Sequence, residues 1–120
     1  MITLTIPDVP PSPNRVLGKH WRTKNGEKNK WVLLVRSVYL PAHVEDVKRS
    51  VVITLCHSRM YDKDNAYASV KPLVDSLKYW NLIVDDTSKW LVLKVQQEKC
   101  PHKQRHTTIQ IGPAIQWKQE

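Results

Sequence analysis

Residues Ser50–His57 most limit what this chain can fold into. Their sequence, SVVITLCH, is rich in β-branched residues and is apolar at consecutive positions rather than at every second one. A strand that is apolar on both faces is typical of the interior of a sheet. We therefore expect a central strand here, with further strands beside it.

Three other stretches have strand patterns. Residues Ile2–Ile6 alternate and end at Pro7, and the prolines that follow cannot enter a central strand. Residues Trp90–Val95 and His106–Ile111 are predicted as the third and fourth strands. Between them, Cys100–Arg105 contains a proline and basic residues, so we predict a hairpin turn that joins these two strands.

Two stretches have helical periodicity. Residues Glu27–Leu40 place their apolar side chains on one helical face, and Pro41 ends the helix. Residues Asn65–Trp80 have a similar pattern but contain Pro72. A proline there either kinks one helix or lies in the first turn of a shorter helix that starts near Lys71, and we favour the second arrangement.

The predicted element order is β-α-β-α-β-β. Strands that are separated by helices and end in a strand pair indicate the α+β class, with a mixed β-sheet and two helices packed on it. A length of 120 residues fits one compact domain, so we expect residues 1–120 to form a single unit.

The sequence has none of the features that direct a chain into or across a membrane. No apolar run approaches the roughly 20 residues of a membrane span. Residues Met1–Pro7 lack the basic-then-apolar layout of a signal peptide. The two cysteines, Cys56 and Cys100, are far apart and do not suggest a secreted disulfide scaffold. We therefore expect a cytoplasmic protein without membrane association.

Charge is distributed unevenly along the chain, which has a net charge of +8 and a pI of about 9.7. Residues Arg15–Arg36 contain seven Lys or Arg and one acid, and residues Thr87–Glu120 contain six and two. In residues Met60–Asp86 the sign reverses, with three Lys against five Asp. A basic surface attracts polyanions, of which nucleic acid is the commonest inside cells. The pattern predicts a phosphate-binding protein with one acidic site.

Two acidic pairs lie in that central segment. Asp62 and Asp64 follow the central strand and precede a helix, a position where a loop can converge with other loops. Asp85 and Asp86 follow the apolar residues Leu82–Val84 and precede the third strand. Carboxylate oxygens are ligands that suit Mg²⁺. If the intervening helix runs back along the sheet, both pairs could meet at one end.

Each acidic pair also has an ordinary structural interpretation. The D-K-D-N string could simply start a helix, because short polar side chains accept backbone N–H bonds. Asp85 and Asp86 could form an exposed turn. Lys71 and Asp75 lie four residues apart and could form an exposed ion pair worth a few tenths of a kcal/mol. The functional alternative is that Lys71 points at a phosphate or at an attacking water. Clustered acids in a basic chain favour a cation between them.

These residues occur in an order that resembles a known family. From Asp62 to Leu77 the sequence reads D-K-D-N-x5-K-x3-D-S-L, and L-I-V-D-D follows. The whole string resembles the RusA family of Holliday junction resolvases, common in prophages. The opening P-P-S-P-N-R of residues Pro10–Arg15 resembles the start of that family. The resemblance spans most of the chain, from Ile2 into the third strand.

The resemblance implies both an activity and a set of site residues. By position, Asp62, Asp64 and Asp86 match the catalytic acids and Lys71 matches the catalytic lysine. The family works as a homodimer, needs Mg²⁺ or Mn²⁺, and resolves four-way DNA junctions by paired nicks in recombination and repair. Asp62, Asp64 and Asp86, with Asp85 beside them, would bind the metal. Lys71 would stabilise charge on the phosphate or orient the water.

Two departures from the family pattern concern the helical segment. The spacer between Asn65 and Lys71 is longer than in the family, which in one continuous helix places Lys71 about 10 Å along the axis from Asp64. A break at Pro72 could bring the lysine closer. Asn81 stands where the family usually has Gly, and Asn tolerates the same left-handed helix end.

Polar and basic residues in the first third of the chain are expected to bind DNA. Contacts of this kind to the phosphate backbone fix position and carry little sequence information. The predicted set is Asn14, Arg15, Lys19, His20, Arg22, Lys24, Lys28 and Lys30. His20 and Trp21 are candidates to stack on bases at the junction centre, although a partly buried loop position is their ordinary interpretation.

One alternative function is a non-catalytic basic DNA-binding module, such as a phage regulator. It explains the net charge but gives the clustered aspartates no task. Another is a different nuclease that uses Asp8, Asp46 and Lys48. These residues lie in highly charged, turn-like stretches, for which solvated surface is the better interpretation.

A further alternative is a zinc protein that uses Cys56, His57, Cys100 and His102. Neighbouring residues on a strand point to opposite faces of the sheet. Cys56 and His57 therefore cannot easily bind the same ion, which counts against this set of ligands.

Overall fold

The computed structural model describes residues 2–11, 21–39 and 47–113, and for residues 21–25 it describes the backbone alone. These residues form four strands, three α-helices and one short 3₁₀ helix. In chain order they are β1 (Ile2–Ile6), α2 (Trp21–Val38), β2 (Arg49–His57), α3 (Lys63–Ser69), α4 (Lys71–Tyr79), β3 (Leu91–Lys99), η1 (His102–Gln104) and β4 (His106–Pro113).

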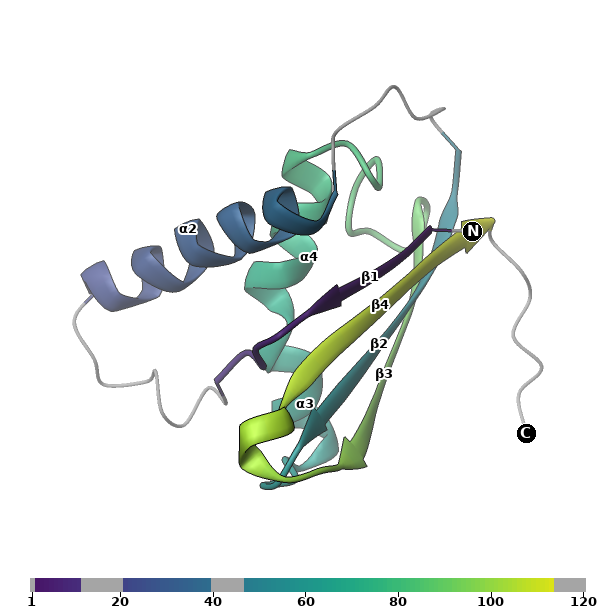
Figure 1. Ribbon diagram of the computed structural model, residues 1–120. Helices are drawn as coiled ribbons and strands as arrows, with labels where there is room; N and C mark the ends of the chain where they lie inside the picture. Colours follow the sequence, from purple (N-terminus) through teal and green to yellow (C-terminus); the bar gives the residue numbers. More distant parts are fainter. Residues whose placement is uncertain (1, 12–20, 40–46, 114–120) are drawn as a thin grey trace.

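The four strands form one mixed sheet in the order β1-β4-β2-β3 (Figure 1). β4 is antiparallel to β1 and to β2, whereas β2 and β3 are parallel. Ile53 of β2 lies between Ile109 of β4 and Val95 of β3. The α+β class, the mixed sheet, the element order and the central place of β2 are therefore confirmed.

The predicted hairpin between the last two strands is wrong. β3 and β4 are not neighbours, because β2 lies between them. A path from one to the other must cross two strand spacings, or about 10 Å, which a tight hairpin turn cannot span. The connection instead includes η1, whose Arg105 N–H bonds to the carbonyl of His102 at 3.2 Å. β3 is left at the sheet edge, and its exposed residues Lys94, Gln96 and Glu98 suit that position.

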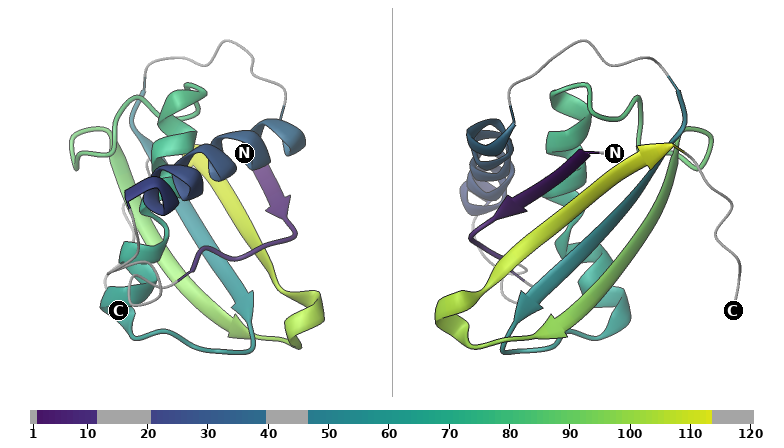
Figure 2. Two further views of the ribbon diagram at one scale, coloured as in Figure 1. Left: turned by 90° about the vertical axis from the view of Figure 1, so that its left-hand side faces the viewer. Right: turned by 45° about the vertical axis from the view of Figure 1, so that its right-hand side comes forward.

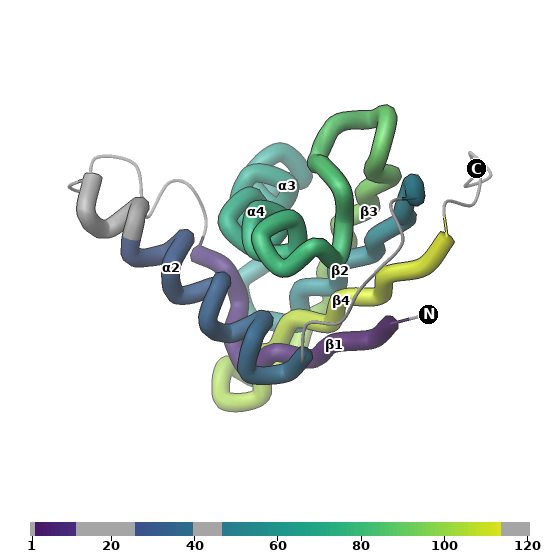
Figure 3. Tube along the Cα trace, turned by 90° about the horizontal axis from the view of Figure 1, so that it is seen from above, coloured from purple at the N-terminus to yellow at the C-terminus, as the bar shows by residue number. Residues whose placement is uncertain are grey.

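All three α-helices lie on the same side of the sheet (Figure 2). Seen from above, α2 runs beside α4 toward the β1 edge (Figure 3). The two helices are tied by a hydrogen bond of 2.8 Å from the Trp80 indole N–H to the carbonyl of Val32. No helix in the described parts of the chain combines the length and the apolar character that crossing a membrane requires.

The core fills the space between the helices and the sheet. Val51, Ile53 and Leu55 of β2 are completely buried, as every second residue of a strand should be when one face is covered. Trp31 of α2 is also completely buried, and its indole N–H donates to Glu27 at 3.3 Å. The residues at alternate positions of β2, such as Cys56, point to the opposite face.

The helical segment after β2 breaks at Val70, which ends α3 and starts α4. Pro72 lies in the first turn of α4, where its missing N–H leaves no helical bond unmade. The predicted start of a shorter helix near Lys71 is therefore confirmed. α2 begins at Trp21, earlier than the predicted Glu27, and β3 extends beyond the predicted Val95.

α4 ends with Asn81 in the left-handed conformation, at φ 60°. The N–H of Leu82 bonds to the carbonyl of Leu77 at 2.9 Å, and the N–H of Asn81 bonds to the carbonyl of Lys78 at 3.1 Å. This pair of bonds is the Schellman motif, which caps the last carbonyls of a helix. The expectation that Asn81 supports a left-handed helix end is confirmed, and the motif turns the chain toward Asp85.

Candidate functional site

The segment that carries Asp62 is anchored to β3 by one side chain. The carboxamide of Gln97 accepts from the Tyr61 N–H at 2.8 Å and donates to the Tyr61 carbonyl at 2.9 Å. The same Gln97 oxygen lies 2.9 Å from Nε2 of His57, which therefore carries the proton of that hydrogen bond. The Tyr61 hydroxyl donates to the carbonyl of Pro10 at 2.9 Å. These contacts fix where α3 begins. Nothing in the sequence pattern singled out Gln97.

Asp62 and Asp64 are exposed at the start of α3. Asp62 is the N-cap residue, but its side chain makes no capping hydrogen bond, so only its backbone carbonyl takes part, through the N–H of Ala66 at 2.8 Å. Neither carboxylate forms an ion pair with another residue of the described ranges. The Asp62 side chain therefore does not cap the helix, as it would in an ordinary D-x-D-N helix start.

Lys71 lies between two carboxylates. Its Nζ donates to Oδ2 of Asp86 at 2.8 Å and to Oδ1 of Asp75 at 3.3 Å. The hydrogen bond to Asp86, with the charge of Asp75, raises the pKa of Lys71 above its usual value even though partial burial opposes this. In turn, the hydrogen bond from Lys71 is the largest cause that lowers the pKa of Asp86. At neutral pH both groups are therefore firmly charged.

Asp85 is held by a second lysine. Its Oδ1 lies 3.0 Å from Nζ of Lys78 and also accepts the backbone N–H of Asp86 at 2.8 Å. The hydrogen bond to Asp85 raises the pKa of Lys78. Two lysines spaced seven residues apart on α4 thus each bind one member of the Asp85–Asp86 pair.

A pocket of about 300 Å³ opens beside Lys71 and Asp86. Its walls come from α3, α4, the loop that carries Asp86, and β3. They are Tyr67, Val70, Lys71, Val74, Asp86, Ser88, Leu91 and Leu93. The Tyr67 hydroxyl accepts the outward-pointing N–H of Val95 at 3.3 Å and so covers part of the free edge of β3. The pocket therefore combines an apolar floor with one cation and one anion at its side.

The two acidic pairs do not meet at one point. Asp62 follows the carboxyl end of β2, whereas Asp86 precedes the amino end of the parallel strand β3, so they approach the sheet from opposite ends. Within the described ranges, no three of Asp62, Asp64, Asp85 and Asp86 bring an oxygen within 4.8 Å of one another. The helical segment does run back along the sheet, but this does not place the pairs together.

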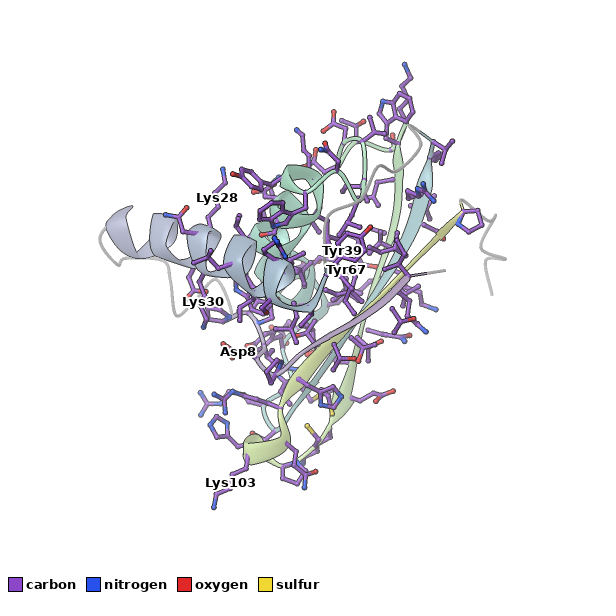
Figure 4. The ribbon with its side chains drawn as sticks, turned by 45° about the horizontal axis from the view of Figure 1, so that its top comes forward. Asp8, Lys28, Lys30, Tyr39, Tyr67 and Lys103 are labelled. Atoms are coloured by element: carbon purple, nitrogen blue, oxygen red, sulfur yellow. The ribbon has the colours of Figure 1, made fainter. Side chains whose placement is uncertain are left out.

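Only part of the predicted DNA-binding set can be placed. Asn14, Arg15, Lys19 and His20 lie outside the described residues, and Arg22 and Lys24 lie in α2 without described side chains. Lys28 and Lys30 are exposed on α2 and point to different sides of the helix (Figure 4). Lys30 is paired with Asp8 at 2.6 Å, so Lys28 is the better placed of the two for a phosphate.

Asp8 joins three elements rather than forming a catalytic set. Besides the ion pair with Lys30, it lies 3.5 Å from Nε of Arg105, and its carbonyl accepts the Thr107 hydroxyl at 2.6 Å. Burial raises the pKa of Asp8, but the bonds from Lys30 and Val9 and the nearby cations outweigh it and lower the pKa overall. Asp46 lies outside the described residues.

A different cluster of ligand atoms lies on the opposite face of the sheet. Cys56, Cys100 and His106 each bring one sulfur or nitrogen within 4.8 Å of the others, the one such group found within the described ranges. His57 and His102 do not belong to it. His106 could not be recognised from the sequence, because its position opposite Cys56 depends on the antiparallel pairing of β2 with β4.

A scan against models of protein families finds no match to this chain, and a search of curated proteins finds none either.

Proposed function

We propose that this chain is a metal-dependent, structure-selective endodeoxyribonuclease that resolves Holliday junctions by paired nicks in DNA recombination and repair. The observation that carries the proposal is the contact between Lys71 and Asp86 at the side of a pocket. This contact places the Lys71 ammonium, which could bind a phosphate, beside the Asp86 carboxylate, which could bind a metal. Asp85 is the neighbouring residue in the chain. The exposed carboxylates of Asp62 and Asp64, at the other end of the sheet, would form a second group of metal ligands.

The donor set has the chemistry of a Mg²⁺ site, with Mn²⁺ as a substitute. Mg²⁺ usually keeps several waters and is bound through one or two carboxylates together with substrate phosphates. Asp85 and Asp86 supply one such pair of oxygens, and Asp62 and Asp64 supply another. The separation of the pairs argues against a single cage of four aspartates and for sites that DNA phosphates complete. A bound divalent ion stabilises charge on the phosphate and activates water.

Lys71 is suited to neutralise phosphate charge. Its raised pKa keeps it an ammonium at neutral pH, so it is not a proton acceptor there. A phosphate oxygen that entered the pocket would compete with Asp75 and Asp86 for this ammonium. Asp86, released from the lysine, would remain a carboxylate at neutral pH, because even the ordinary pKa of an aspartate, about 3.9, lies well below 7. Phosphate binding and metal binding would thus support each other.

The proposed substrate is branched DNA, bound by a homodimer. Lys28 and the basic residues before it would hold the phosphate backbone, and such contacts weaken as salt rises. A two-fold dimer presents two equal sites to a two-fold junction, which gives one cut in each of two strands. The net charge of +8 supports the binding of a polyanion.

Substitution of single acids tests the site. With Mg²⁺, the wild type should nick a synthetic four-way junction symmetrically. Asp64→Asn and Asp86→Asn should lower the rate by about 100-fold or more, the size of effect seen when a group that stabilises transition-state charge is lost. Both should still bind the junction in a gel-shift assay, because neither removes a phosphate contact.

Asp75→Asn is the matched control, since Asp75 contacts the same lysine but is not a proposed metal ligand. It should cut within a few-fold of the wild-type rate. Equal rates for wild type, Asp64→Asn and Asp86→Asn would refute the site. A loss that is as large in Asp75→Asn would show that these substitutions act through the Lys71 ion pairs or through the fold, and not through metal binding.

A second candidate function is a non-catalytic DNA-binding module. The observation that favours it is that Lys71 and Lys78 already neutralise Asp86 and Asp85 without a metal. Junction binding that is the same in Mg²⁺ and in EDTA, with no cleavage of any branched DNA, would support this module over the nuclease.

A further inference from the structure

Three strands bring metal-binding atoms together on the sheet face opposite the helices. Thr107 and Ile109 of β4 point into the core, so His106 points to the other face, as Cys56 of β2 does. The antiparallel register sets His106 directly opposite Cys56. Cys100 follows β3 and is held by a hydrogen bond of 3.1 Å from its N–H to the carbonyl of His57.

We propose that Cys56, Cys100 and His106 form a zinc site. Two thiolates and one imidazole are the ligands that tetrahedral Zn²⁺ prefers, and they are too soft for Mg²⁺. Bond lengths of about 2.3 Å to sulfur and 2.0–2.1 Å to nitrogen set the ligand atoms about 3.6–3.8 Å apart in a tetrahedron. The three atoms now lie within 4.8 Å of one another, so closing the site needs shifts of about 1 Å.

A hydrogen bond to the backbone selects the tautomer of the histidine. Nδ1 of His106 lies 2.8 Å from the carbonyl oxygen of Gln104. A carbonyl can only accept, so Nδ1 carries the proton and Nε2 keeps its lone pair. Histidines that bind metals usually donate their other N–H to a carbonyl or a carboxylate in this way.

The fourth ligand is a carboxylate or a water. Glu98 lies opposite Cys56 on the other neighbouring strand, and its charge is close enough to act on the Cys56 thiol. Carboxylate oxygen is an accepted ligand of Zn²⁺. Glu98→Gln should therefore weaken zinc binding less than loss of any of the other three ligands.

The hydrogen bond with Cys100, together with burial, raises the pKa of Cys56 to about 11. Zinc binds cysteine as the thiolate, so binding releases protons to solvent and zinc affinity should fall as the pH falls. The bound ion would join the ends of β2 and β3 to the start of β4. It would thereby hold the segment that connects β3 to β4 across the end of β2. It would therefore act on stability rather than on cleavage.

Metal content of the full-length protein tests the site. The protein should be purified without a histidine tag and kept reduced, then incubated with Zn²⁺, desalted and assayed by mass spectrometry of metals. We expect about one zinc per chain and, with Co²⁺, the absorption of a tetrahedral thiolate site. Zinc should also raise the midpoint of thermal unfolding, because the fold brings the three ligands together and the unfolded chain binds the ion more weakly.

Cys100→Ser and His106→Ala should each weaken zinc binding by at least about 100-fold, since even loss of a supporting hydrogen bond costs about 10- to 100-fold. His102→Ala, a neighbouring exposed histidine outside the cluster, is the matched control and should bind as the wild type does. Circular dichroism checks that each variant is folded, and His106→Gln replaces His106→Ala if the latter is not.

Three outcomes would overturn the site. One is a folded, reduced wild type that retains no zinc. Another is equal zinc content in the wild type, Cys100→Ser and His106→Ala. The third is a Cys56–Cys100 disulfide that forms even in protein kept reduced, seen as a loss of two hydrogens in the mass of the intact chain. None of these outcomes bears on the proposed nuclease, whose residues lie elsewhere.

Discussion

Lys71 illustrates how one side chain can serve both a structural and a chemical role. It contacts Asp75 one helical turn away and Asp86 from the loop after α4, although it is largely exposed. Ion pairs of such exposure contribute about 0–1 kcal/mol to folding. The contribution of these ion pairs to the free energy of folding is therefore small, whereas the hydrogen bond from Lys71 lowers the pKa of Asp86. This favours a role in the site over a role in stability.

Replacing Lys71 by Met should raise the pKa of Asp86, because the hydrogen bond from Lys71 is the largest cause of its lowering. NMR titration of the side-chain carboxyl carbon measures that pKa in both proteins. The free energy of unfolding at neutral pH should change by less than about 1 kcal/mol. An unchanged pKa of Asp86 would mean that the two side chains do not pair in solution.

At the scale of elements, the helix break and the helix end decide where the site residues lie. The break at Val70 starts a new helix with Lys71 in its first turn, and the Schellman motif at Asn81 directs the chain back toward Asp85. Both features could be predicted from the sequence, from Pro72 and Asn81 respectively. The role of Gln97 could not, because it depends on which strand lies beside the carboxyl end of β2.

Substitutions at Asn81 test the left-handed helix end. Asn81→Gly should leave the free energy of unfolding within a few tenths of a kcal/mol or raise it slightly, since Gly adopts a positive φ freely. Asn81→Val should lower it by about 1–2 kcal/mol, because a β-branched side chain is strained there. Urea denaturation measures both, and Asn81 is exposed, so packing does not interfere. Equal stability of the two variants would contradict the conformation.

At the scale of the whole molecule, the sequence predicted the fold class and the central strand but not the strand order. Residues Ser50–His57 could be recognised as central because they are apolar at consecutive positions. The crossing from β3 to β4 could not, because a six-residue connection with a proline also suits a hairpin. Because a hairpin would have placed β4 beside β3, the pairing of Cys56 with His106 could not be predicted. The wide separation of Asp62 from Asp86 was hidden for a similar reason, since it depends on β2 and β3 being parallel.

Asp8 connects the N-terminal strand to the rest of the molecule through Lys30 and Arg105. Because its pKa is lowered in the folded protein, its contribution to stability is present above the unfolded value near 3.9 and is lost as the pH falls through the folded value. Asp8→Asn should therefore cost about 1 kcal/mol at pH 7 and progressively less below about pH 4.

Urea denaturation at a series of pH values measures this difference. Asp75→Asn, which removes an exposed pair within one helix, should cost only a few tenths of a kcal/mol at pH 7. A cost for Asp8→Asn that stays constant down to acid pH would show that the carboxylate charge is not what joins these elements.

The most direct test of the proposed activity is cleavage of a four-way junction by the wild-type protein, compared with a linear duplex of the same sequence. We expect symmetric nicks in the junction with Mg²⁺ or Mn²⁺, none in EDTA, and an intact duplex throughout. A folded protein that binds the junction but leaves it uncut in both metals, or one that cuts equally well in EDTA, would contradict this expectation.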